Sequence, residues 1–254
     1  NYTGSATDVL SISDLTPPVP DQDPLPDLRD ECSLTPLAPT ATDFYTGPVT
    51  GTTTTPFPIT AQGTTVVTWS YDDGNGNIST QDQTIVIDDV TNPVAPTLSD
   101  VSGECSVTAP TPSTTDACAG IISATTSDPQ TYTTVGTHII TWTFDDGHGN
   151  SLDVPQNVIV TDVSDPVTPT LTDLHGDCSV TAVAPTTTDN CAGTISGTTT
   201  DPLSYSAQGS FVITWTFDDG NGNAIQVTQN VLVADMTDPI TPVLSDVTAE
   251  CSVT

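Results

Sequence analysis

Two residue types in this sequence can supply chemistry, aspartate and cysteine, and both recur at a fixed interval. The phrase Asp-Asp-Gly-x-Gly-Asn occurs three times, at residues 72–77, 145–150 and 218–223. A cysteine between an acidic residue and a serine occurs four times, at Cys32, Cys105, Cys178 and Cys251, and the interval between successive copies is constant. A constant period of this length predicts a series of small repeated domains, so a site in one repeat should recur in the next.

The carboxylate and amide oxygens of the acidic phrase are ligands that calcium prefers. The segments between repeats add further aspartates, as in the linkers of calcium-binding cadherins. However, Asp-Gly and Asn-Gly are also strong signals for a hairpin turn, and no glutamate follows at the spacing of an EF-hand loop. Two interpretations stay open, a calcium site and a plain turn with solvated carboxylates. The candidate ligands are Asp72, Asp73, Asn77, Asp89, Asp145, Asp146, Asn150, Asp162, Asp165, Asp218, Asp219, Asn223, Asp235 and Asp238.

Four of the six cysteines form two pairs with the same separation, Cys105 with Cys118 and Cys178 with Cys191. This spacing predicts one local disulfide in a repeat and therefore an oxidising compartment. Cys32 and Cys251 have no partner in the chain under this scheme, which indicates a window cut from a longer array. A zinc site is not favoured, because the three histidines do not occupy equivalent positions.

The charge of the chain excludes several classes of function. There are 32 acidic residues, one arginine (Arg29) and no lysine, which gives a net charge of -31. Such a surface repels nucleic acid and anionic membranes, and no apolar run is long enough to insert into a bilayer. No set of nucleophile, histidine and carboxylate recurs, so we do not expect an enzyme.

The residues around three tryptophans alternate between apolar and polar. In the first repeat Val67, Trp69 and Tyr71 fall on one face of a strand, and Trp142 and Trp215 occupy the same position in the next repeats. This alternation predicts a strand with a buried face and a tryptophan at the centre of each core. The acidic phrase follows directly, and a second β-branched run comes after it, so the two strands should form a hairpin.

The period divides the chain into five segments. Three of them are full repeats, namely 14–89 (repeat 1), 90–162 (repeat 2) and 163–235 (repeat 3). The segment 1–13 is interpreted as the closing strand of a preceding repeat or, as a second choice, a strand donated to another copy. The segment 236–254 is interpreted as the start of a further repeat. An Asp-Pro or Asn-Pro pair in each linker should make it stiff.

The repeated motif resembles the hyalin-repeat family and its immunoglobulin-like relatives in large bacterial cell-surface proteins. The matching features are Asp-x-Thr-x-Pro-Val at the start of a repeat and Trp-x-Phe-Asp-Asp-Gly-x-Gly-Asn near its end. Repeat 1 departs from the pattern, with Tyr45 where Cys118 and Cys191 stand. The resemblance implies an all-β fold of tandem immunoglobulin-like β-sandwich domains arranged head to tail, in extracellular structural or adhesive proteins without catalytic residues.

We therefore expect a segment of an extracellular surface filament or stalk whose partners are copies of itself. The alternative is a cell-surface adhesin that binds glycans or another surface, through loops such as residues 44–46 and 203–205. Calcium is the one cofactor suggested, and neither nucleic acid nor membrane insertion is expected. Asn1 and Asn77 fit the glycosylation sequon.

Overall fold

The computed structural model describes residues 13–248, and all regular secondary structure in that range is β-strand. Most of the predicted closing or donor strand, together with Asn1 and Cys251, lies outside the described residues. Within them there is no helix of the length and hydrophobicity required to cross a membrane. The predicted all-β class is confirmed.

The contacts within the chain define two compact units. The first contains residues 1–99, 110–129 and 139–156, and the second contains residues 100–109, 130–138 and 157–254. The division runs through repeat 2, and each unit includes one complete junction between successive repeats. Domain boundaries at the ends of the repeats therefore stay a prediction.

Repeat 1 lies in the first unit and consists of two small sheets. Its strands are β1 (Val19–Pro20), β2 (Leu28–Asp30), β3 (Thr40–Asp43), β4 (Gly47–Thr50), β5 (Gly63–Asp72) and β6 (Ile78–Ile87). One sheet has the order β1-β3-β4 and the other β2-β6-β5, with β2 parallel to β6. Buried residues of both sheets, among them Ala41 and Val49 from one and Trp69 and Ile85 from the other, form one core cluster. The repeat is therefore a β-sandwich.

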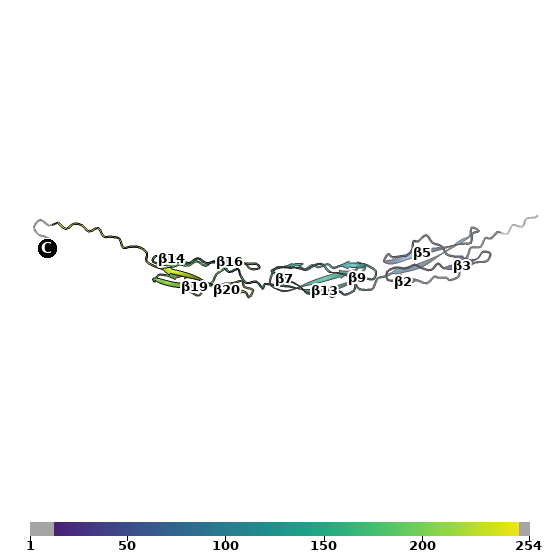
Figure 1. Cartoon of the computed structure of the whole chain (residues 1–254). Helices are drawn as coiled ribbons and strands as arrows, with labels where there is room; N and C mark the ends of the chain where they lie inside the picture. Colours follow the sequence, from purple (N-terminus) through teal and green to yellow (C-terminus); the bar gives the residue numbers. More distant parts are fainter. Residues whose placement is uncertain (1–12, 249–254) are drawn as a thin grey trace, which may run out of the picture. The chain divides into compact units, whose positions relative to one another are not determined.

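The same plan occurs in the other two repeats. Repeat 2 contains β7 (Val101–Glu104), β8 (Val107–Thr108), β9 (Ser113–Asp116), β10 (Gly120–Ser123), β11 (Thr131–Tyr132), β12 (Gly136–Asp145) and β13 (Ser151–Thr161). Repeat 3 contains β14 (Leu174–Gly176), β15 (Val180–Thr181), β16 (Thr186–Asp189), β17 (Gly193–Ser196), β18 (Ser204–Tyr205), β19 (Gly209–Asp218) and β20 (Ala224–Val233). Their three-stranded sheets have the orders β12-β13-β7 and β14-β20-β19. Figure 1 labels β7, β9 and β13 of repeat 2 and β14, β16, β19 and β20 of repeat 3.

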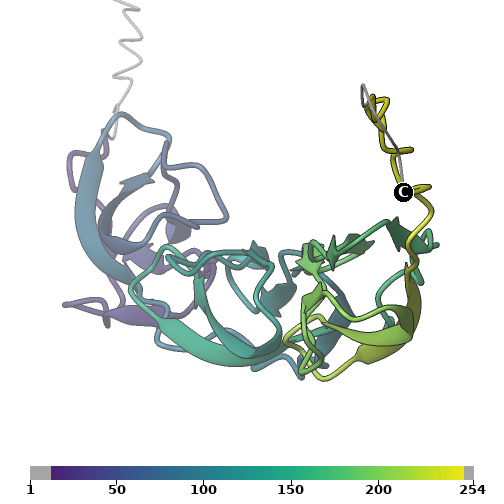
Figure 2. The ribbon, with the colours of Figure 1, turned by 90° about the vertical axis from the view of Figure 1, so that its left-hand side faces the viewer.

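The longest strands form a hairpin in each repeat, as the alternation around the tryptophans predicts. In repeat 3 the antiparallel register of β19 and β20 runs from Asp218 opposite Ala224 to Gly209 opposite Val233. Figure 2 shows the long strands from a second direction as curved arrows. The acidic phrase is the connection between the two strands of each hairpin, so the hairpin determines where its aspartates lie.

Each tryptophan is buried and also makes a polar contact. The indole nitrogens of Trp69, Trp142 and Trp215 donate to a glutamine side chain on the partner strand, at 3.1, 2.9 and 2.9 Å. The glutamine amide then donates to a backbone carbonyl of the segment that opens the repeat; in repeat 3 this is Gln229 to Thr172 at 2.8 Å. A buried indole N–H needs such an acceptor, and here it ties the opening segment to the core.

Candidate cation sites and disulfides at the repeat joints

The acidic and cysteine residues meet where one repeat passes into the next. We call the region around Asp89, between repeats 1 and 2, the first joint, and the region around Asp162, between repeats 2 and 3, the second joint. The first joint lies entirely in the first compact unit and the second joint entirely in the second. A related cluster around Asp14 lies at the start of repeat 1.

The second aspartate of the acidic phrase organises the hairpin turn. Asp146 Oδ1 accepts the backbone N–H groups of His148 (2.7 Å) and Asn150 (3.1 Å), and its Oδ2 accepts the Asn150 side-chain amide (2.7 Å). Asp73 and Asp219 make the same three kinds of bond in their repeats. The turn also needs Gly147, whose φ of 78° is in the left-handed region.

These hydrogen bonds keep the turn aspartates ionised. Burial by itself would raise the pKa of Asp146, but the donors on Asn150 and His148 outweigh it, so the pKa lies below its ordinary value. The pKa values of Asp73 and Asp219 are lowered in the same way. Each turn therefore holds a negative charge at neutral pH.

The turn is also attached to the linker. The Asn150 side-chain amide donates to the backbone carbonyl of Asp89 at 2.9 Å, and Asn223 makes the equivalent bond to Asp162 at 3.3 Å. Asn77 bonds to the carbonyl of Asp14 at 3.2 Å. The acidic phrase is thus a hairpin turn, as one interpretation predicts, and it also holds the linker in place.

A third aspartate at each joint was not among the predicted ligands. Asp116 is the last residue of β9, and its Oδ1 accepts the N–H groups of Cys118 (2.7 Å) and Ala119 (2.9 Å) in the turn to β10. These donors lower its pKa against the opposing effects of burial and of the nearby Asp146 charge. Asp189 makes the same two bonds, to Cys191 and Ala192. A signal for them exists in the sequence, an aspartate two positions before each of these cysteines.

Carboxylates from the linker, the loop and the hairpin converge at these joints. At the second joint, ligand atoms of Asp162, Asp189 and Asp219 all lie within 4.8 Å of one another. The corresponding residues Asp14, Asp43 and Asp73 are equally close. At the first joint the group within 4.8 Å comprises Asp89, Asp146 and His148.

Some of these carboxylate oxygens are buried and accept no hydrogen bond. Among the described residues, the buried side-chain oxygens without a partner are Asp116 Oδ2, Asp162 Oδ1 and Asp189 Oδ2. Their residues are only 7%, 9% and 7% exposed. A buried anionic oxygen without a donor is costly, and a hard divalent cation with oxygen ligands would compensate it. The chain itself supplies almost no cation, since it has one arginine and no lysine.

The first joint has a histidine where the second has an asparagine. His148 Nδ1 lies 3.0 Å from Asp89 Oδ2, and the side chain of Asp89 is fully buried. At the second joint Asn221 donates to Asp162 Oδ2 at 2.8 Å. The backbone N–H of Thr91 donates to Asp89 Oδ1 at 3.1 Å, so both oxygens of Asp89 have partners.

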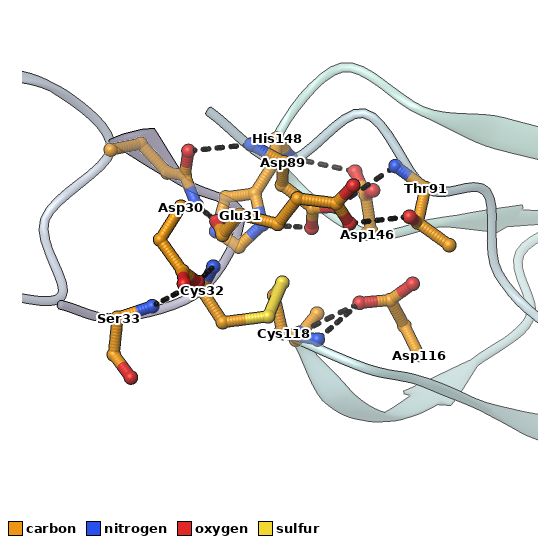
Figure 3. Close-up of a disulfide and its surroundings, with 12 residues drawn as sticks. Asp30, Glu31, Cys32, Ser33, Asp89, Thr91, Asp116, Cys118, Asp146 and His148 are labelled. Atoms are coloured by element: carbon orange, nitrogen blue, oxygen red, sulfur yellow. Dashed lines mark hydrogen bonds and ion pairs between the residues drawn. A yellow bond between two sulfur atoms is a disulfide. The ribbon is translucent and has the colours of Figure 1, made fainter. Parts of the chain in front are cut away.

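The disulfides cross the joints, and the prediction of local pairs within a repeat is wrong. Cys32 of repeat 1 is bonded to Cys118 of repeat 2, and Cys105 of repeat 2 to Cys191 of repeat 3, each over a separation of 86 residues. The Cα–Cα distances are 4.8 and 4.7 Å. Cys32, predicted to be unpaired, is therefore bonded, and the free cysteine of the described residues is Cys178. Figure 3 shows Cys118 on its turn beside Asp116 and bonded to Cys32.

The strand pattern explains why a local pair cannot form. In repeat 3, Cys178 follows β14, whose residue Gly176 pairs with Val233 at the far end of the hairpin. Cys191 lies instead near the hairpin turn, because the adjacent Asp189 is close to Asp219. A ten-residue strand, about 30 Å long, separates these two ends. Disulfide formation requires Cα atoms within about 7 Å, so the cysteines of one repeat face opposite neighbours.

The acidic residues before Cys32 and Cys105 accept hydrogen bonds from the linker. Glu31 accepts a hydrogen bond from the Thr91 hydroxyl at 2.5 Å, and Glu104 accepts one from the Ser164 hydroxyl (Figure 3 shows the first). Glu104 also accepts from Asn190 at 3.1 Å, and these donors, Ser164 first, lower its pKa. The acidic residue and the cysteine that recur at the start of each repeat therefore both belong to the joint.

The remaining predicted ligands lie outside these clusters. The first aspartates of the phrase, Asp72, Asp145 and Asp218, are exposed and accept the N–H of the glycine two positions on, at 2.8 Å in each case. The other exposed candidates are Asp165, Asp235 and Asp238. The Asn77 amide donates to both Asp14 and Asp73, and a glycan on that nitrogen would remove one of these bonds.

The chain is similar in sequence to hyalin. It is 32% identical over 235 residues to hyalin of Lytechinus variegatus, which covers 82% of this chain and 44% of hyalin. It is 34% identical over 138 residues to hyalin of Strongylocentrotus purpuratus, and this match covers 49% of this chain and 12% of that hyalin. The chain thus spans less than half the length of the curated relatives it matches. No family model matches, but these similarities support a hyalin-repeat-like family, and they do not bear on a bacterial origin.

Solved structures of extracellular cadherin domains align with most of the chain. The protocadherin gamma B4 extracellular domain is 15% identical with a TM-score of 0.31, over 89% of this chain and 51% of that one. Cadherin domains 1–5 of protocadherin gamma B2 are 14% identical with a TM-score of 0.30, over 87% and 61%. We base no conclusion on this likeness, because the TM-scores are low.

Proposed function

We propose that the chain is part of an extracellular structural protein, a filament or stalk, in which each repeat is fixed to the next at its joint. The similarity to hyalin supports the family resemblance from which this expectation comes. The observation that carries the proposal is the disulfide between successive repeats, since it adds a covalent bond to the linker that connects them. Disulfides of this kind belong to an oxidising environment outside the cytosol.

Calcium is the second element of the proposal. At the second joint the ion would be held by Asp162, Asp189 and Asp219, and it would satisfy the unpartnered oxygens of the first two. These ligands are oxygens that come from a linker, a loop and a hairpin, so a bound ion would connect segments of two repeats. Calcium binding would therefore stiffen the same joint that the disulfide closes.

Labelling of the cells that make the protein would test the structural role. Gold-labelled antibodies against this chain should decorate fibres or a layer outside the cell at high density. Label confined to the cell interior would contradict the proposal. Sparse label only at contacts between cells would favour adhesion instead.

Adhesion is the second candidate, and one observation favours it. In repeat 1 the loop that carries a cysteine in the other repeats presents Phe44 (88% exposed) and Tyr45 (60% exposed), with their rings 5.0 Å apart in a T-shaped arrangement. Exposed aromatic faces of this kind can stack on sugars or on another protein. The second predicted loop is less suitable, because Tyr205 belongs to the core of repeat 3. Replacing Phe44 and Tyr45 by serine should abolish binding to a glycan array if adhesion is the function.

Thermal unfolding would test the calcium site directly. Saturation of a site at one hundred times its dissociation constant adds about 2.7 kcal/mol to the stability of the folded state. The unfolding midpoint should therefore rise with calcium and fall back with a chelator, while magnesium, which prefers its own hydration shell, should have a smaller effect. Equal midpoints in calcium and chelator would leave only the hairpin-turn interpretation.

A further inference from the structure

We propose that the two disulfides give the chain a second property, a covalent limit on how far it can be stretched. The inference rests on which cysteines are bonded, and it does not depend on where the protein acts or on calcium. It concerns the covalent path that carries tension along the chain after the non-covalent contacts within the repeats have broken.

The two disulfides enclose overlapping segments of the chain. One joins Cys32 to Cys118 and the other joins Cys105 to Cys191. Because Cys105 comes before Cys118, the segment 105–118 belongs to both loops. We call this shared segment the strap, and it is the shortest covalent connection between the two disulfides.

The strap shortens the covalent path greatly. Through the disulfides the path runs from Cys32 to Cys118, back along the strap to Cys105, and on to Cys191. At about 3.5 Å per extended residue, the roughly 13 residues of the strap measure roughly 45 Å. The backbone route from Cys32 to Cys191 has roughly 159 residues and measures roughly 550 Å. Tension therefore passes through the strap, and the longer route stays slack.

The strap consists largely of extended chain. It contains β8 and β9, and Pro110 and Pro112 lie between these strands. Strands and proline-rich segments are already close to full extension, so stretching gains little length from them. The hydrogen bonds of β8 to β11 and of β9 to β10 must break before the strap can lengthen at all.

Most of each sandwich lies outside this path. The segments 33–104 and 119–190 are bypassed, and they include the hairpins that carry Trp69 and Trp142. A bypassed hairpin can open without lengthening the chain, so force does no work on its unfolding. The disulfides thus take the hairpins of repeats 1 and 2 off the path of the force, while β8 and β9 of repeat 2 stay on it. A local disulfide between Cys105 and Cys118 would leave both hairpins on the path.

Single-molecule force spectroscopy on the 254-residue chain, with a handle at each terminus, tests this inference. Cys178 and Cys251 are replaced by serine in every protein compared, which prevents bonds between molecules. The oxidised chain should be shorter at full extension than the reduced chain by roughly 146 residues, or roughly 500 Å. A local disulfide between Cys105 and Cys118 would exclude only about 13 residues from the extended length, so a difference of that size would overturn the proposal. A length that does not depend on reduction would overturn it as well.

Two matched variants isolate the overlap. The pair Cys105→Ser with Cys191→Ser leaves one disulfide, and the pair Cys32→Ser with Cys118→Ser leaves the other. In each variant the remaining disulfide should exclude 86 residues from the extended length, and we say that it hides them. The chain with both disulfides should hide less than the sum of these two values, by about 26 residues, because the path crosses the strap in reverse.

The outcome that would refute the strap is a chain with both disulfides that hides no more than either variant. In that case only one disulfide would lie on the path of the force. Because this measurement is made on the isolated chain, its outcome is separate from that of the cell labelling.

Discussion

The two joints share their covalent bond and differ in how they balance charge. Both have a disulfide over 86 residues and an asparagine that bonds to the linker carbonyl. At the first joint, both carboxylate oxygens of Asp89 have a partner, and one partner is His148. At the second joint, Asp162 Oδ1 has none. His148 and Asn221 both contact Oδ2 of the linker aspartate, so the joints differ at Oδ1, to which the Thr91 N–H donates only at the first joint. The other unpartnered oxygen, on Asp116 or Asp189, is common to both joints.

The turn residue adds a second difference between the joints. An imidazole can hold a proton and so become a cation, and it fills space beside the carboxylate. An asparagine amide stays neutral and leaves three carboxylates facing one another at the second joint. We therefore expect the second joint to depend more strongly on calcium than the first.

Removing a disulfide should have the largest effect, and it should be the same at both joints. In the loop-entropy model, a loop of 86 residues stabilises the folded state by about 4.6 kcal/mol. Each double serine variant should therefore lose stability of this order in urea unfolding followed by tryptophan fluorescence with a chelator present. A large difference between the two variants would show that the joints are not covalently equivalent.

The next largest effect should come from the loop aspartates, and here the joints should differ. Asp189→Asn keeps the oxygen that accepts from Cys191 and Ala192 but removes the charge that faces Asp162 and Asp219. It should abolish most of the calcium-induced stabilisation of the second joint, up to about 2.7 kcal/mol at one hundred times the dissociation constant.

The matched change Asp116→Asn at the first joint is the control for this experiment. It preserves the equivalent turn, and its effect on the calcium response should be smaller, because the first joint binds the ion less tightly. The measurement is the shift of the unfolding midpoint with calcium for each variant. Equal losses in the two variants would refute the proposed difference between the joints.

The hairpins and the cores could be predicted from the sequence because they depend on local pattern. Alternation around Trp69 places the indole on the buried face, and Gly74 and Gly76 mark the turn that follows. These features need only the two-residue period of a strand and the left-handed conformation that glycine adopts. The three-aspartate clusters needed more, because Asp43 and Asp189 reach them from the ends of separate strands, β3 and β16.

The disulfide pattern shows where sequence reasoning fails. The close spacing of Cys105 and Cys118 suggests a short loop, and the constant period makes that spacing recur at Cys178 and Cys191. The same period equally allows Cys105 to pair with Cys191, which is the counterpart of Cys118 in the next repeat. Spacing cannot distinguish these two schemes. The choice depends on which end of the sandwich each cysteine occupies, and that follows from the parallel pairing of β14 with β20 and of β2 with β6.

The smallest expected effect is an exchange of the residue that distinguishes the joints. His148→Asn should make the first joint resemble the second, because it replaces the imidazole beside Asp89 by the amide that bonds to Asp162. We expect calcium affinity at the first joint to rise only slightly, by less than about 1 kcal/mol, because the asparagine amide would make the contact with Asp89 Oδ2 that the imidazole makes now. Isothermal titration with calcium measures this change.

The reverse exchange, Asn221→His, should weaken calcium binding at the second joint by a similar factor. The imidazole would occupy space beside Asp162 Oδ2 and leave fewer oxygens facing the ion. A chain with both exchanges should therefore keep its stronger site at the second joint, where Asp162 Oδ1 has no partner, with the total calcium uptake unchanged. If the stronger and weaker sites are interchanged in that chain, the difference between the joints lies in the turn and not in the linker that follows Asp162, where Ser164 replaces Thr91.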